Sequence, residues 1–183
     1  MSLARIRIAA RLLAVAAMAA LTAGCFQPMY AEHADGTPGL RDKMLGVELP
    51  PVDKPNASPE ARIGVEVRNA LAFKLYGNAT GTTPTHKLVL RFSTSRSSLL
   101  VSPTTGLPTS ENFGIDAQYN LVEVGTNKSV MTGTTFSRVT YDMPGSYQRF
   151  SRARALRDAE DRAAQEIAGN IQTRIASFFF AGT

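Results

Sequence analysis

The sequence predicts an α+β domain in which two helices pack on one face of a four-stranded, mainly antiparallel sheet, in the order β-α-β-β-β-α. Three patterns support this prediction: an apolar stripe at helical spacing, then alternating apolar residues through the middle of the chain, then a second helical stripe near the C-terminus. The chain has 183 residues, 44% of them hydrophobic and 19% charged, which is enough for one domain with its own core.

The first helix is predicted over residues 59–76. Ser58 is a suitable N-cap, Pro59 suits the first helical position, and Gly77 suits the C-terminal end. Between these signals, apolar residues recur every four positions, at Ile63, Val67, Leu71 and Leu75.

Strands are predicted on both sides of this helix. Residues 44–49 form a short predicted strand that ends at a proline pair, and residues 88–93 alternate between the two faces of a second strand. The third strand shows the cleanest alternation, with apolar residues at Phe113, Ile115, Ala117, Tyr119 and Leu121. A turn at 125–128 leads to a Thr-rich fourth strand over 129–141, in which a bulge is expected.

The last helix supplies the cover that one face of an antiparallel sheet needs. Its apolar residues fall at steps of three and four, at Leu156, Ala159, Ala163, Ile167, Ile171, Ile175 and Phe178. The acidic residues of this segment are expected on the solvated face of the helix, at Asp158, Glu160, Asp161 and Glu166.

The N-terminus has the pattern of a lipoprotein signal peptide. Three arginines precede an apolar segment over residues 12–20, which is too short to span a membrane as a helix. The following Leu21-Thr22-Ala23-Gly24-Cys25 looks like a bacterial lipobox, and its thiol is the nucleophile that would take a lipid group. We therefore predict a signal peptide over 1–24, a lipid-anchored tether over 25–44 and a single domain over 45–183.

Composition and motifs exclude several functions. Removal of the predicted signal peptide leaves 17 basic and 15 acidic residues, a net charge of +2 that is too small for nucleic-acid binding driven by overall charge. One cysteine and two histidines favour neither a metal centre nor a cofactor site. No Gly-x-Ser-x-Gly, phosphate loop or His-Glu-x-x-His motif is present, and His86 is expected to be a solvated residue at a strand edge.

Two groups of cations are candidates for binding an anionic ligand. The first follows one predicted strand and includes Arg91 and Arg96, and the second lies at the start of the last helix, at Arg149, Arg152, Arg154 and Arg157. Cations at a helix N-terminus oppose the helix dipole, whereas arginine suits the bidentate binding of phosphate and carboxylate. A solvated, internally paired set of arginines remains the alternative at this point.

The lipobox, the segment Gly24-Cys25-Phe26-Gln27-Pro28-Met29-Tyr30, the order of elements and the Arg/Asp/Ala-rich last helix together resemble the LptE family, especially its alphaproteobacterial branch. The resemblance implies a protein that is not an enzyme. It implies an outer-membrane lipoprotein on the periplasmic side, which plugs the LptD β-barrel, helps it to assemble and takes part in inserting lipopolysaccharide into the outer leaflet.

The resemblance also suggests one ligand contact. A basic residue near the start of the last helix contacts lipopolysaccharide in this family, and Arg157 holds that position here. A second family cation, in the loop between the first two meander strands, is missing, since this chain has Ser102, Pro103 and Thr104 there.

Three other functions remain open from the sequence. The protein could be an auxiliary lipoprotein of another envelope lipid-transport machine, an anchored periplasmic enzyme, or a structural lipoprotein without a ligand.

Overall fold

The computed structural model describes residues 36–79, 82–143 and 149–181. Cys25, the predicted signal peptide and the first part of the predicted tether lie outside the described residues. The chain divides into two units, Met1–Gly39 and Leu40–Thr183. Every helix and strand described below belongs to the second unit, in the order α2, β1, α3, β2, β3, β4, α4.

Helix α3 spans Pro59–Tyr76, as the sequence predicts. The Ser58 hydroxyl accepts a hydrogen bond from the Ala61 backbone N–H at 3.0 Å, so one of the free donors at the helix start is satisfied. At the other end Gly77 adopts a φ of 59°, which favours glycine, and its N–H donates to the Phe73 carbonyl.

The sheet has the strand order β1-β2-β3-β4, with β1 at Val47–Glu48, β2 at His86–Val101, β3 at Pro108–Glu123 and β4 at Ser129–Asp142. Strand β1 runs parallel to β2, which α3 makes possible by crossing over between them. The other neighbouring pairs are antiparallel. The predicted fold class is therefore confirmed.

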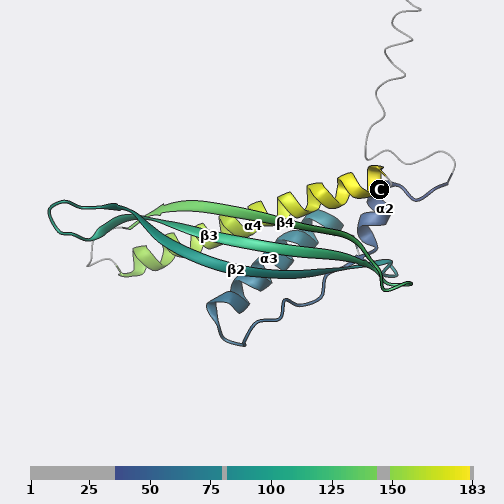
Figure 1. The fold of residues 1–183 in the computed structure, drawn as a ribbon, viewed down its shortest axis with the longest axis horizontal. Helices are drawn as coiled ribbons and strands as arrows, with labels where there is room; N and C mark the ends of the chain where they lie inside the picture. Colours follow the sequence, from purple (N-terminus) through teal and green to yellow (C-terminus); the bar gives the residue numbers. More distant parts are fainter. Residues whose placement is uncertain (1–35, 80–81, 144–148, 182–183) are drawn as a thin grey trace, which may run out of the picture. The chain divides into compact units, whose positions relative to one another are not determined.

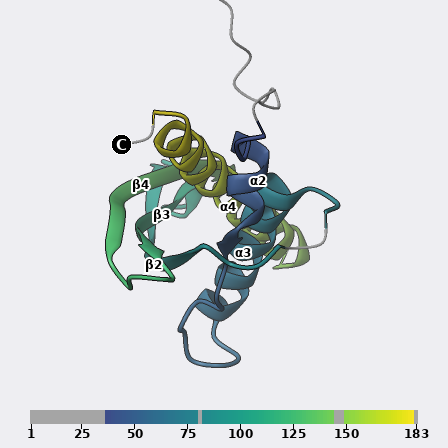
Figure 2. The ribbon, with the colours of Figure 1, turned by 90° about the vertical axis from the view of Figure 1, so that its right-hand side faces the viewer.

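Figures 1 and 2 show α3 and α4 on the same face of the sheet, where the core lies. Helix α4 spans Arg149–Ala181, and its predicted apolar stripe is buried at Ala159, Ala163, Ile167, Ile171 and Ile175. The alternating residues of β3 face this stripe and are also buried, at Phe113, Ile115, Ala117, Tyr119 and Leu121. The other face of the sheet carries mainly polar side chains, with Phe136 exposed among them.

Bulges interrupt the strand pairing at two places. In β4 the register changes at Val130, because Leu121 pairs with Met131 whereas Val122 pairs with Ser129, which confirms the expected bulge. The far end of the β2–β3 hairpin has two register changes, which leave Leu99 and Thr109 without a direct partner across the ladder.

The predicted start of the domain needs two corrections. The tether prediction extends to residue 44, but residues Leu40–Leu45 form helix α2, whose Leu40 and Met44 are buried in the core. The predicted strand over 44–49 is shorter, because only Val47 and Glu48 pair with β2. Both differences have one cause. A six-residue helix is too short to be stable alone, but packing against α3 and α4 stabilises α2, and α2 then takes up residues 44 and 45 of the predicted strand.

Candidate anion-binding groove

Glu160 is a buried carboxylate on the inner side of α4, with only 2% of its side chain exposed. Arg62 of α3 donates a hydrogen bond to its Oε2 atom and forms an ion pair with it. Arg96 of β2 approaches its Oε1 atom from the other side, with 3.7 Å between the guanidinium nitrogen and the oxygen. The Glu160 carboxylate thus links α4 to α3 and to β2. Because two guanidiniums face this single carboxylate, Arg62, Arg96 and Glu160 together carry a net positive charge.

A cavity of about 570 Å³ lies beside this group. Arg157 of α4 lines it together with Arg62, Arg96 and Glu160, so three arginines and a single carboxylate face the same space. Ser58 and Pro59 place the positive end of the α3 dipole at its wall. The remaining lining is mainly apolar, from Ala57, Ala61, Val65, Ala153 and Leu156.

A second cavity of about 340 Å³ shares Arg96, Ala153 and Leu156 with the first. Arg152 lines it and donates a weak hydrogen bond to the Met143 sulfur at 3.6 Å. Its other walls come from β2, β3 and β4, at Ser97, Ser98, Glu111 and Tyr141, and from Met143 just after β4. We call the two adjoining cavities the arginine groove. Its four cations are Arg62, Arg96, Arg152 and Arg157.

Tyr141 supplies a phenol to the wall of the groove, and the pKa of this phenol is strongly raised. Burial raises its pKa to about 12, and the hydrogen bond that its hydroxyl donates to Glu111 adds to the effect. Because the folded-state pKa lies above the ordinary value, the neutral phenol stabilises the fold below about pH 10, and this contribution is lost as pH rises toward 12.

We therefore expect Tyr141 to titrate later than an ordinary tyrosine. A spectrophotometric titration should show a tyrosinate step near pH 12 that disappears in Tyr141→Phe. Glu111→Gln should move this step to lower pH, because it removes a negative charge beside the phenolate. If Glu111→Gln leaves the step unchanged, the negative charge of Glu111 does not contribute to it, since the Gln carbonyl can still accept the hydrogen bond.

The structure brings together some of the predicted site residues and separates others. Arg96, Arg152 and Arg157 line the groove, whereas Arg149 and Arg154 are exposed on α4 and do not line either cavity. Arg91 lines a different cavity, of about 380 Å³, on the opposite face of the sheet. Residues five positions apart on an extended strand point to opposite faces, so the first predicted cluster is not a single site.

Sequence reasoning missed Arg62 and placed Glu160 wrongly on a solvated face. A signal for Glu160 was present, because it stands four residues after Leu156 and three before Ala163, on the apolar stripe of the helix. His86 is also less solvated than expected. Its ring packs edge-on against Phe179 with 5.0 Å between centroids, and burial lowers its pKa.

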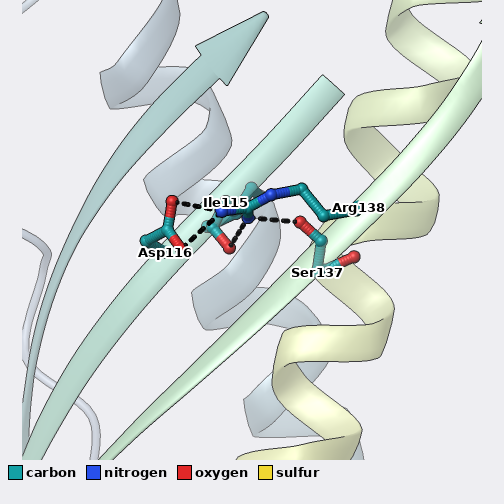
Figure 3. A network of polar contacts seen from close by, with 4 residues as sticks. All are labelled: Ile115, Asp116, Ser137 and Arg138. Carbon is teal, nitrogen blue, oxygen red and sulfur yellow. Dashed lines mark hydrogen bonds and ion pairs between the residues drawn. The ribbon is translucent and has the colours of Figure 1, made fainter. Parts of the chain in front are cut away.

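Arg138 lies on the face of the sheet opposite to α3 and α4, and its guanidinium already binds groups of the same chain. Figure 3 shows its guanidinium bound to both carboxylate oxygens of Asp116, at 2.7 and 2.9 Å, and to the backbone carbonyls of Ile115 and Ser137. Asp116 also lines the cavity that contains Arg91. An anion bound there would meet a repelling carboxylate as well as an attracting cation. The arginine groove is the stronger candidate.

Two features are absent from the part of the chain that the structure describes. No group of three or more His, Cys, Asp or Glu residues is arranged there to hold a metal ion. Among those same residues, no helix is both long and apolar enough to cross a bilayer.

The fold, in which helices α3 and α4 back an antiparallel meander, is shared by solved structures of bacterial lipoproteins. A lipoprotein from Caulobacter crescentus CB15 is similar over 79% of this chain and 97% of its own, at 21% identity and a TM-score of 0.60. The rare lipoprotein B of Shewanella oneidensis is similar over 73% of this chain and 95% of its own, at 18% identity and a TM-score of 0.51. At these identities the likeness concerns the fold. No curated protein matches the chain.

The family model of LptE, described as lipopolysaccharide-assembly, matches residues 45–175. The chain therefore belongs to the LptE family, which confirms the resemblance seen in the sequence. The description of that family assigns the chain to lipopolysaccharide assembly.

Proposed function

We propose that this protein is an outer-membrane lipoprotein that fits inside an LptD-type β-barrel on the periplasmic side, helps the barrel to assemble and takes part in inserting lipopolysaccharide. In this proposal residues 1–24 are removed, Cys25 is acylated, and the residues between Cys25 and α2 form the tether. Stable anchoring needs more than one acyl chain, which lipoprotein maturation supplies at such a cysteine. The observation that carries the ligand part of the proposal is the convergence of four arginines on one groove.

The chemistry of the groove suits an anionic glycolipid. Lipopolysaccharide carries phosphates and carboxylates on its lipid A and core sugars, and guanidinium groups bind both in a bidentate manner. Arg62, Arg96 and Arg157 come from three different elements, so a phosphate in the larger cavity can be approached from several sides. Leu156 and Val65 beside them offer apolar contact to the rest of the ligand.

The surface suits a protein enclosed by a barrel. The lumen of an outer-membrane barrel is polar. The net charge of +2 that remains once residues 1–24 are removed, and the polar face of the sheet away from the helices, are compatible with it. The barrel partnership is tested by purifying the native protein from detergent-solubilised outer membrane and identifying what accompanies it by mass spectrometry. A large outer-membrane barrel would support the proposal, whereas an inner-membrane transporter would favour an auxiliary lipoprotein of another lipid-transport machine.

Charge reversal at Arg157 tests the ligand contact. We expect Arg157→Glu to weaken binding of lipopolysaccharide about tenfold or more, because a hydrogen bond to a charged group contributes roughly 1.5–3 kcal/mol. The measurement is a binding titration of the purified protein with lipopolysaccharide at fixed ionic strength.

Arg154→Glu is the matched control for this experiment. It makes the same charge change on the same helix, but Arg154 does not line the groove. Equal losses of affinity in the two variants would mean that net charge, not the groove, governs binding, and unchanged affinity in Arg157→Glu would remove this residue from the site.

A further inference from the structure

The face of the sheet opposite to α3 and α4 contains the cavity of about 380 Å³ that Arg91 lines. Much of its lining comes from two adjacent rungs of paired residues across the three long strands. These rungs are Arg91, Gln118 and Thr134, and then Ser93, Asp116 and Phe136. Residues two positions apart on a strand point to the same face, so these side chains project to one side of the sheet. We call the six residues the sheet-face site.

The sheet-face site is close to electrically balanced. It contains one cation, Arg91, and one carboxylate, Asp116, which is itself paired with Arg138 at 2.7 Å. The larger cavity of the arginine groove, by contrast, is lined by three arginines and a single carboxylate. Because a charged ligand would be attracted by one group of the sheet-face site and repelled by the other, this site favours a ligand without net charge.

The polar side chains of the site provide both kinds of hydrogen-bonding group. Arg91 can only donate and Asp116 can only accept, whereas Gln118, Ser93 and Thr134 can do both. Among the residues that the structure describes, none binds the side chains of Arg91, Gln118 or Thr134 through a hydrogen bond or an ion pair. These exposed groups are therefore available to a ligand whose own groups donate and accept, as hydroxyls do.

Arg138 holds Asp116 and Phe136 in place beside each other. Its guanidinium is fixed by the carbonyls of Ile115 and Ser137 and binds both oxygens of Asp116 (Figure 3). These oxygens keep further lone pairs for a ligand. The same guanidinium lies 5.6 Å from the centroid of the Phe136 ring, while 66% of Phe136 remains exposed. An acceptor and an aromatic ring that are already positioned lower the entropy cost of binding.

A sugar ring combines the two properties that this arrangement recognises. The hydroxyls of a pyranose donate and accept hydrogen bonds, and the C–H groups of one ring face form an apolar surface that stacks on an aromatic ring. We propose that the sheet-face site binds neutral hexopyranose units, with Phe136 against the apolar face of the sugar and with Arg91, Asp116 and Gln118 at its hydroxyls.

The inference goes beyond the proposed function, because it assigns an uncharged ligand to a face of the sheet that the arginine groove does not reach. It is compatible with enclosure by a barrel, since the lumen of an outer-membrane barrel is polar. Its failure would leave the barrel partnership and the Arg157 contact untouched, because neither depends on the sheet-face site.

The absence of tryptophan from the chain allows a reporter to be placed in the site. In the full-length protein carrying Phe136→Trp, which keeps an aromatic ring there, the methyl glycosides of glucose, galactose and mannose are titrated into the millimolar range. We expect a saturable change of emission with at least one of them, because the sugar replaces water at the indole face. Phe73→Trp is the control, because Phe73 is 71% exposed on α3 and does not line this cavity.

The outcomes of this titration separate a sugar site from general effects on tryptophan. A saturable change with none of the three glycosides would overturn the proposal, and so would an equal change at position 73. Inorganic phosphate should leave the emission at position 136 unchanged, and a response to phosphate as large as that to the glycosides would contradict the preference for a neutral ligand.

A matched pair of amide substitutions tests the hydrogen bonds. In the Phe136→Trp background, Gln118→Ala should weaken binding of the responding glycoside about fivefold, because one hydrogen bond to the sugar is lost. Gln165→Ala, on an exposed glutamine of α4, should leave this affinity unchanged. Equal affinities in the two variants would exclude Gln118 from the site and overturn the arrangement proposed for it.

A last comparison identifies the source of the sugar. The lipid-free, neutral polysaccharide part of lipopolysaccharide is titrated beside the responding monomeric glycoside. Tighter binding of the polysaccharide per sugar ring would assign the site to the same glycolipid as the arginine groove, whereas equal binding would assign it to a free sugar; either result requires the hexopyranose site that we propose.

Discussion

Replacing Arg62 with methionine is expected to lower the free energy of unfolding by about 3 kcal/mol, because it leaves the Glu160 carboxylate buried with only the longer Arg96 contact. Glu160 is 2% exposed, so its carboxylate is largely desolvated and depends on Arg62 for most of its compensation. The measurement is equilibrium unfolding in urea, with an unchanged m-value as the sign that the folded state is intact.

A double substitution identifies the buried charge as the cause. Arg62→Met with Glu160→Met should recover most of the stability lost in Arg62→Met, because no buried charge is then left unpaired; Arg96, which also loses its contact with Glu160, is half exposed and stays hydrated. Arg154→Met, on an exposed arginine of α4, should change stability by no more than about 0.5 kcal/mol. A double variant as unstable as the single variant would show that the Arg62 side chain stabilises the fold by packing instead.

The pair of Arg62 and Glu160 also links stability to the ligand site. The same guanidinium that neutralises Glu160 lines the larger cavity of the arginine groove. Its position is therefore held by a buried partner and does not depend on a ligand. A groove whose cations are already in place avoids the entropy cost of ordering long side chains on binding.

The second large effect is expected at Gly133 of β4. Gly133 pairs with Tyr119 of β3, and the phenol ring of Tyr119 covers the glycine in the core, where only 5% of the tyrosine is exposed. A Cβ atom added at Gly133 would lie 2.5 Å from the ring carbon Cζ, which is far inside van der Waals contact. We expect Gly133→Ala to lower the free energy of unfolding by roughly 2 kcal/mol, because the rigid ring must move within a packed core.

Gly125→Ala is the matched control for this substitution. Gly125 lies in the turn between β3 and β4, and an added Cβ there meets nothing within 4 Å. Thermal or urea unfolding of both variants should show a near-neutral effect at Gly125. Combining Gly133→Ala with Tyr119→Leu should cost less than the two single effects added together, because the smaller side chain removes the clash. Strict additivity would contradict the proposed contact.

Helix α3 illustrates what local sequence can predict. Its start and end depend on Ser58, Pro59 and Gly77, each of which acts on backbone groups within a few residues. Its buried face follows from the four-residue spacing of Ile63 to Leu75, and the same reasoning holds for the alternation along β3. These signals act within one element, so no knowledge of the remaining chain is needed to read them.

Helix α2 and strand β1 show where such signals fail. Six residues are too few to form a stable helix alone, and two residues are too few to show an alternation. Leu40 and Met44 are buried because α3 and α4 provide a surface for them, and β1 exists because the edge of β2 is available for pairing. The stabilising free energy for both comes from neighbours distant in the chain.

The arginine groove divides in the same way. The arginines are recognised as candidates for an anionic ligand from residue type and charge alone. The prediction that the Cys25 thiol takes a lipid group has the same basis, because both concern chemical properties of side chains. Which arginines share a site depends on the path of the backbone: Arg62 and Glu160 are 98 positions apart, and Arg91 and Arg96 fall on opposite faces of one strand. Folding alone brings cations from α3, β2 and α4 around one buried carboxylate, because close packing of helices on a sheet removes the water that would otherwise keep those charges apart.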